Sequence, residues 1–143
     1  MKDKIMRIVD ANLNRSREGL RVCEDIARFA LSSETSTKEL RSIRHSISAI
    51  AKRFESQLGS VAGSRDAVED IGRSSRMKGG IKRGSLRDVL ISNMERSKES
   101  LRVLEEFFKI IEPSASKRFS RLRFKVYDVE KNILRKIDSL RNS

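Results

Sequence analysis

The strongest constraint in this sequence is an internal repeat. Residues 11–29, ANLNRSREGLRVCEDIARF, align without gaps on residues 92–110, SNMERSKESLRVLEEFFKI, with eight identities in nineteen positions. Further along the chain, RSIRHSI corresponds to SRLRFKV, which pairs Arg44 with Arg123. Apolar residues recur at helical spacing in both copies. A duplicated pair of helices predicts an all-α fold, in which two helical hairpins related by a pseudo-twofold axis pack as a four-helix bundle.

Helix boundaries follow from the apolar spacing and from capping signals. We expect helices at 4–31, 37–58, 85–111 and 115–140, all within one domain of 143 residues. Ser36 and Glu39 fit a capping box at the start of the second helix, and Pro113 ends the third. Residues 59–84, rich in Gly, Ser and Arg, form a long loop between hairpins 4–58 and 85–140.

The net charge of +12 predicts an anionic partner: nucleic acid, a membrane surface or a phosphorylated small molecule. The excess is spread along the chain, which argues against a membrane anchor or a nucleic-acid arm. The single cysteine, Cys23, is predicted to be a small core residue. No apolar run is long enough to cross a bilayer, so we expect a cytoplasmic protein without membrane contact.

Polar residues interrupt the predicted core faces. On a helical wheel, Asn12 and Arg15 fall among the apolar residues of the first helix, and Asn93 and Arg96 do so in the third. The second and fourth helices likewise each turn one arginine toward the core, Arg44 and Arg123.

Buried guanidinium groups need partners, because an unpaired one would offset much of a folding margin of about 5 to 15 kcal/mol. Few carboxylates fall at the facing core positions; Glu130 is the main exception, and the wheel places Glu24 on the solvated face. Internal pairing or arginine stems that reach water would satisfy the charges. The alternative is a cavity that holds phosphate groups, to which arginine forks bind in a bidentate manner.

The loop contains a second group of charged residues. Arg65 lies next to Asp66, and Asp70 follows four residues later, a pattern suited to Mg²⁺ on phosphate oxygens or to a solvated loop. The glycines match no phosphate-binding loop motif. His45, the only histidine, is predicted to lie on the surface or behind the site rather than to act as a base.

Several segments together resemble one known family. DANLNRSREGLRVCEDIARF, LRSIRH, RDAVEDIG, NMERSKESLRVLEEFFK and RLRFKVYDVEK occur in the order typical of the small single-domain hydroxymethylpyrimidine phosphate kinases, which occur alone or fused ahead of thiamine phosphate synthase. Ser16 stands where the family is expected to have alanine, and Cys23 where it is expected to have leucine.

The resemblance implies transfer of the γ-phosphoryl of ATP, with Mg²⁺, to 4-amino-5-hydroxymethyl-2-methylpyrimidine phosphate, giving the diphosphate used in thiamine synthesis. A separate thiamine phosphate synthase would consume that product and is a candidate partner. Under this resemblance the phosphates would be held by Arg15, Arg44, Arg96 and Arg123, the substrate would be oriented by Asn12, Asn93 and Arg65, and Mg²⁺ would be bound by Asp66 or Asp70.

Two other functions stay open at this point. A non-catalytic domain that binds a phosphorylated ligand or the synthase would use the same inward arginines. A basic helical nucleic-acid-binding module fits the charge, but aromatic residues make up only 5% of the chain and there is no Trp for base stacking. A homodimer is also compatible with the sequence.

Overall fold

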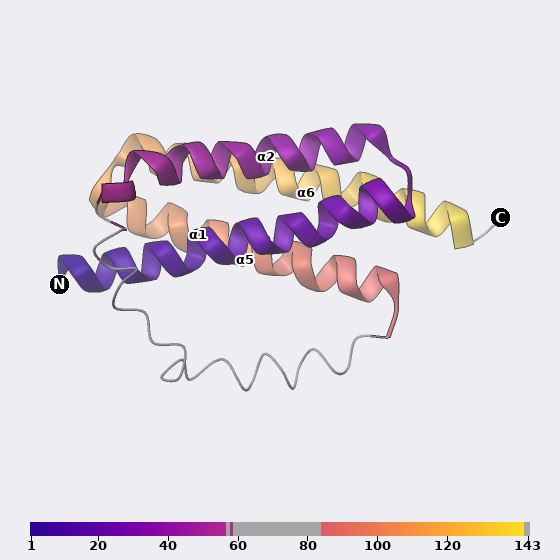
Figure 1. Cartoon of the computed structure of the whole chain (residues 1–143), viewed down its shortest axis with the longest axis horizontal. Helices are drawn as coiled ribbons and strands as arrows, with labels where there is room; N and C mark the ends of the chain where they lie inside the picture. The colour runs from indigo at the N-terminus through magenta and orange to yellow at the C-terminus, as the bar shows by residue number, and fades with distance from the viewer. Residues whose placement is uncertain (57, 59–83, 142–143) are drawn as a thin grey trace.

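The computed structural model describes residues 1–56, 58 and 84–141. The elements are α1 (Lys2–Asp25), the π-helix η1 (Ile26–Ala30), α2 (Glu34–Arg53), α5 (Leu86–Ile111) and α6 (Pro113–Arg141). The described residues contain no strand, which confirms the all-α prediction. Four long helices lie side by side (Figure 1).

The helices follow a fixed order around the bundle. α1 packs against α2 and α5, while α6 packs against α5 and α2. Ser97 Oγ donates to the Ser16 carbonyl at 3.2 Å, and Cys23 Sγ lies 3.8 Å from the Leu90 carbonyl, so α1 and α5 run antiparallel. The α1–α2 turn therefore lies at one end of the bundle, and the α5–α6 turn lies at the other with the start of α1 (Figure 1).

One continuous apolar core joins the four helices. Phe108 of α5 is fully buried and contacts two other rings, with centroid distances of 5.1 Å to Phe54 and 4.9 Å to Phe119. Cys23 is buried as predicted, and burial together with the negative charge of Glu130 raises the pKa of its thiol to about 12. The thiol is therefore a packed, protonated core group at neutral pH.

The ends of the helices differ in detail from the predictions. α2 begins at Glu34, with Ser33 as its N-cap: the Ser33 hydroxyl accepts from the Ser36 N–H at 3.4 Å. The predicted capping box at Ser36 is therefore wrong by one turn. The start of the third helix is confirmed, since Ser85 Oγ accepts from the Asp88 N–H at 3.1 Å. Pro113 is the first residue of α6, a position that suits its fixed φ and missing donor.

The π-helix η1 changes which residues face the core after the end of α1. A π-turn adds one residue to a helix and shifts the phase of everything after it. A wheel at 100° per residue through the predicted helix 4–31 places Ala30 on the core face with Cys23, but Ala30 is exposed and Leu31 is buried in its place. The π-turn lies in the first hairpin alone, because the matching stretch of α5 is regular α-helix.

In the described part of the chain, none of the helices is both long and apolar enough to span a bilayer.

Candidate functional site

The two halves of the molecule meet where α1 crosses α5, and small residues line this contact. A Cβ atom added to Gly19 would overlap the Ser97 hydroxyl and lie 2.8 Å from the Asn93 carbonyl oxygen. Ser16 and Ser97 are fully buried beside it. The absence of a side chain at Gly19 therefore lets the two backbones approach closely.

Both predicted asparagines lie on this part of α1 and α5. Asn12 donates its side-chain amide to the Ile8 carbonyl at 2.8 Å, and Asn93 donates to the Val89 carbonyl at 2.8 Å. The same bond, one turn back along its own helix, thus recurs in both halves. It fixes each side chain and leaves the amide oxygen as the acceptor for a further donor.

The two arginines of the repeated Asn-x-x-Arg motif also lie at the α1–α5 contact. Arg96 reaches across to α1, where its guanidinium lies 3.6 Å from the carboxylate of Glu18, a side chain that is 68% exposed. Arg15 precedes Glu18 by three residues and so shares its side of α1. It is half-buried, and among the described residues no carboxylate lies within ion-pair distance of it. We call Asn12, Arg15, Asn93 and Arg96 the central cluster.

The other two predicted arginines lie elsewhere and have carboxylate partners. Arg44 of α2 donates to both carboxylate oxygens of Glu24, at 3.2 and 3.4 Å, and Arg123 of α6 donates to Glu105 at 3.1 Å. Glu24 lies nine residues beyond Arg15, or roughly 13 Å along the helix. The structure therefore does not bring the four arginines together in one cavity.

These pairs correct the helical wheel, which placed Glu24 on the solvated face. The Glu24 side chain is only 2% exposed, because α2 covers it with Arg44 and Arg41. Glu24 and its repeat equivalent, Glu105, are therefore two buried anions that the sequence analysis missed. One signal was available: Glu24 and Glu105 are identical in the aligned repeats, as are Arg44 and Arg123.

Glu130, the main carboxylate predicted at a core-facing position, has Lys98 as its partner. The Lys98 ammonium lies 2.9 Å from Glu130 and also contacts Glu95. Burial alone lowers the pKa of Lys98, but hydrogen bonds to Glu130 and Glu95 outweigh it, so the pKa is raised. Lys98 is thus a buried, charged group that the sequence analysis did not single out.

The remaining predicted residues do not enlarge the central cluster. Arg65, Asp66 and Asp70 lie outside the described residues. Within the described ranges, no group of three or more His, Cys, Asp and Glu side chains has the arrangement needed to hold a metal ion. His45 is exposed on α2, in agreement with the prediction of a surface position.

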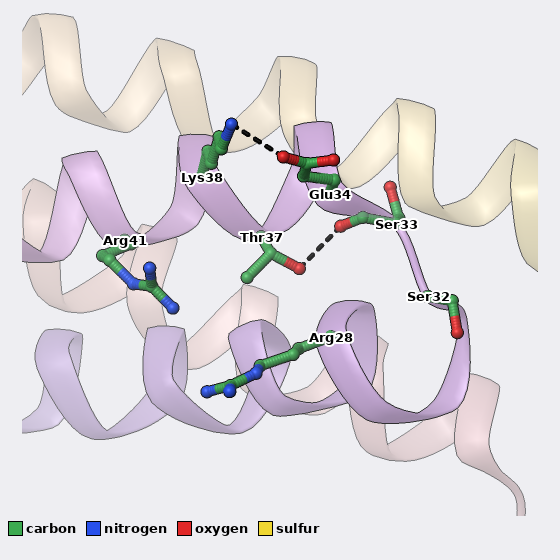
Figure 2. Close-up of a pocket in the computed structure, with 7 residues that line it drawn as sticks. All are labelled: Arg28, Ser32, Ser33, Glu34, Thr37, Lys38 and Arg41. Atoms are coloured by element: carbon green, nitrogen blue, oxygen red, sulfur yellow. Dashed lines mark hydrogen bonds and ion pairs between the residues drawn. The ribbon is translucent and has the colours of Figure 1, made fainter.

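A separate hollow lies at the α1–α2 turn. It has a volume of about 360 Å³ and is lined by side chains from η1, the turn and the first turns of α2 (Figure 2): Arg28, Ser32, Ser33, Glu34, Thr37, Lys38 and Arg41. Ser32 has a φ of 51°, a left-handed conformation that is uncommon for a residue with a side chain. The chain therefore turns sharply at the edge of this hollow.

Comparison with known proteins adds a family to this geometry. The model of the ThiD2 family matches residues 7–132. The chain is 35% identical over 130 residues to a thiamine-phosphate synthase of Nostoc punctiforme, and the match covers 91% of this chain and 35% of that protein. Thiamine-phosphate synthases of a Synechocystis strain and of Prochlorococcus marinus are each 37% identical, and the match covers 36% of each.

The chain spans about a third of the length of these curated relatives, so it corresponds to one domain of them. No solved structure is significantly similar to it. The family match extends from the first half of α1 into α6 and includes all of the central cluster and both buried Glu–Arg pairs. The chain is a member of the ThiD2 family.

Proposed function

We propose that this protein transfers the γ-phosphoryl group of ATP to 4-amino-5-hydroxymethyl-2-methylpyrimidine phosphate, giving the diphosphate. Two findings support a role in thiamine synthesis: the ThiD2 family match and the homology to a domain of proteins named thiamine-phosphate synthase. The specific reaction rests on the resemblance of the sequence motifs to the hydroxymethylpyrimidine phosphate kinases.

The observation that carries the proposal is the central cluster. Both halves present an asparagine and an arginine at the α1–α5 contact, and Arg15 is half-buried with no carboxylate among the described residues to neutralise it. Glu18, the partner of Arg96, is largely exposed and forms a weak pair. An incoming phosphate would therefore meet the guanidinium of Arg15, which no described carboxylate neutralises, beside the guanidinium of Arg96.

The proposed chemistry suits such a site. An oxygen of the substrate phosphate attacks the γ-phosphorus of ATP, a new P–O bond forms, and the bond to the β,γ-bridging oxygen breaks, so that ADP leaves with the electron pair. The attacking oxygen is already anionic, so no strong base is required. Catalysis then depends on alignment and on neutralisation of charge on the phosphoryl oxygens, which Arg15 and Arg96 would provide.

Other residues would support these two arginines. Asn12 and Asn93 are held by their own helices and would orient the phosphates or the pyrimidine. Arg44 and Arg123, which pair with buried carboxylates, would act as positioning residues. Mg²⁺ bound with ATP would neutralise phosphate charge. Arg65 remains a proposed substrate contact, and Asp66 or Asp70 remains the proposed Mg²⁺ ligand.

The test is an assay with ATP, Mg²⁺ and the pyrimidine phosphate, coupled to an added thiamine phosphate synthase that converts the diphosphate to thiamine phosphate. The unphosphorylated pyrimidine is run in parallel. We expect product from the phosphate alone. Arg15→Ala and Arg96→Ala should each lower kcat/KM by about tenfold or more, because each removes a contact to the transferring group.

Arg7→Ala is the matched control, since Arg7 is an exposed arginine on the same helix and lies outside the central cluster. Its kcat/KM should stay within twofold of the parent value. If Arg15→Ala and Arg96→Ala behave like this control, the central cluster is not the site. Binding of the pyrimidine phosphate without turnover by the folded protein would instead indicate a non-catalytic ligand-binding domain.

A further inference from the structure

The hollow at the α1–α2 turn contains more positive than negative charge. Arg28 and Arg41 extend from η1 and α2 into the space between these elements, whereas Lys38 turns along α2 toward Glu34 (Figure 2). Lys38 and Glu34 form an ion pair at 2.8 Å, so the single carboxylate of the lining is already engaged. It does not neutralise the two arginines.

The surroundings do not neutralise them either. Arg41 lies 3.7 Å from Glu24, but Arg44 and Arg21 share the same carboxylate, at 3.2 and 3.3 Å. Among the described residues, Arg28 has no carboxylate within ion-pair distance; its guanidinium lies 4.8 Å above the ring of Phe29. Of the two arginines at the hollow, Arg28 therefore has no carboxylate partner among the described residues, and Arg41 shares Glu24 with two other arginines.

A second hollow adjoins the first one along α2. It has a volume of about 470 Å³, shares Lys38 and Arg41, and adds the cationic or titratable side chains of His45 and Arg118. Carboxylates are absent from the lining of this second hollow among the described residues. Cationic side chains thus line both hollows, from the α1–α2 turn along α2, and Arg41 belongs to both of them.

The second hairpin provides an internal comparison. In the aligned repeats the equivalent of Arg28 is Lys109, which is paired with Glu106 at 2.9 Å, and the equivalent of Arg41 is Ser120. The separation between paired residues also differs: Glu24 and Arg44 are 20 residues apart, and Glu105 and Arg123 are 18 apart. The longer first hairpin, with η1 and the left-handed Ser32, is the one that leaves two arginines without full neutralisation.

The geometry points to a second anion site, in which the α1–α2 hollow binds the phosphate or diphosphate group of a small molecule between Arg28 and Arg41. Guanidinium groups bind phosphate oxygens in a bidentate, charge-assisted manner. The hydroxyl of exposed Ser32 at the edge of the hollow is a further donor. A volume of about 360 Å³ is within the range of small-molecule sites.

This site is distinct from the central cluster. Its lining residues come from η1, the turn and the start of α2, whereas the central cluster lies on α1 and α5. The inference therefore does not depend on the kinase reaction. A nucleic acid backbone presents the same phosphate chemistry in another class of molecule, and the experiment separates the two.

The test is titration of the full chain with inorganic diphosphate, followed by isothermal calorimetry and by NMR shifts of the backbone amides around the α1–α2 turn. An Arg15→Ala background weakens binding at the central cluster, and the position of the NMR shifts separates the two sites. We expect saturable binding in this background, with shifts at Ser32 and Ser33. Arg28→Gln should weaken the affinity by about tenfold, because one charge-assisted contact is lost.

Lys109→Gln is the matched control, because it removes the equivalent charge in the second hairpin and should leave the affinity within twofold. Arg41→Ser, which introduces the residue of the second hairpin, should weaken binding as Arg28→Gln does. Arg28→Gln removes no carboxylate contact, so its result is interpretable even if Arg41→Ser unfolds.

Equal affinities of the parent, Arg28→Gln and Lys109→Gln proteins would overturn the inference. So would an absence of saturable diphosphate binding in the Arg15→Ala background. Binding of a duplex oligonucleotide that is lost in Arg28→Gln, without any diphosphate binding, would assign the surface to nucleic acid and would also overturn it.

Discussion

The two hairpins of this protein have the same buried polar contacts but differ in the charged residues around them. Each has an asparagine bonded one turn back along its helix, and each joins a glutamate of its first helix to an arginine of its second. In the first hairpin three arginines surround Glu24, whereas two surround Glu105. The repeated pairs connect the two helices of each hairpin, and the first hairpin has one more arginine around its buried glutamate than the second.

Substitutions in the buried Glu–Arg pairs should cause the largest loss of stability. Glu24→Gln removes a carboxylate whose side chain is 2% exposed and leaves three arginines around a neutral amide, so it should lower the free energy of unfolding by roughly 3 kcal/mol. Glu105→Gln should cost less, because its side chain is 11% exposed and only two arginines depend on it. Urea unfolding of both variants measures the difference, and a larger loss for Glu105→Gln would reverse the comparison.

The next effect tests the contact between the halves. Gly19→Ala should destabilise the protein by about 2 kcal/mol, because the new methyl group would lie 2.8 Å from the Asn93 carbonyl oxygen and overlap Ser97 Oγ. The repeat equivalent of Gly19 is Ser100, whose hydroxyl bonds within its own helix. Ser100→Ala is therefore the control and should change thermal stability much less. Equal melting temperatures for the parent and Gly19→Ala would show that α1 and α5 can move apart without loss of stability.

A smaller effect distinguishes two equivalent basic residues, Arg17 and Lys98. Lys98→Met removes the partner of Glu130, a carboxylate that is 14% exposed, and should cost about 1 to 2 kcal/mol. Among the described residues, Arg17 bonds only to neutral oxygens, of Asn14 and Ser48, and burial lowers its pKa. Arg17→Met should therefore be close to neutral in denaturant unfolding. A larger loss of unfolding free energy in Arg17→Met than in Lys98→Met would contradict this prediction.

The smallest effect concerns pH and the residue that differs between the two cores, Cys23 against Leu104. The folded state raises the pKa of the Cys23 thiol from 9.0 to about 12, so it binds this proton more tightly than the unfolded chain does. The resulting stability is present in full below pH 9 and is lost as the pH rises toward 12. About 1.4 kcal/mol should be lost by pH 10.

Cys23→Ala provides the control for this pH dependence. Removal of the thiol should flatten the stability profile between pH 8 and 10, although the variant is less stable at every pH because it loses buried volume. Chemical denaturation across this range measures the profile. An unchanged slope in Cys23→Ala would assign the loss of stability to other groups.

The sequence predicted the four helices, the repeat and the polar intrusions into the core, because apolar periodicity and duplication are local patterns. It failed at Glu24, which the wheel places on the solvated face. A wheel records the direction of the Cα–Cβ bond, whereas a carboxylate two bonds further out reaches toward an arginine on a neighbouring helix. It also failed at Ala30, because a wheel drawn at 100° per residue contains no π-turn.

The central cluster was predicted in part. Asn12, Arg15, Asn93 and Arg96 lie at one contact because they occupy equivalent positions of two repeats that meet there. Arg44 and Arg123 were grouped with them because a wheel shows the angle around a helix axis and not the position along it. The hollow at the α1–α2 turn was missed for another reason: its lining comes from η1, the turn and α2, and a wheel of one helix does not show how such elements pack together.

Each buried ion pair lies within a single hairpin: Glu24 with Arg44 in one, and Glu105 with Arg123 in the other. The buried glutamate of each hairpin therefore has its counterion in the same hairpin, and small residues line the close approach of α1 and α5 at Gly19. The two hairpins therefore pack against each other as the two subunits of a dimer would, although they belong to one chain. Because the buried Glu–Arg pairs do not cross from one hairpin to the other, mixing halves from different relatives is a practical way to build hybrid proteins of this family.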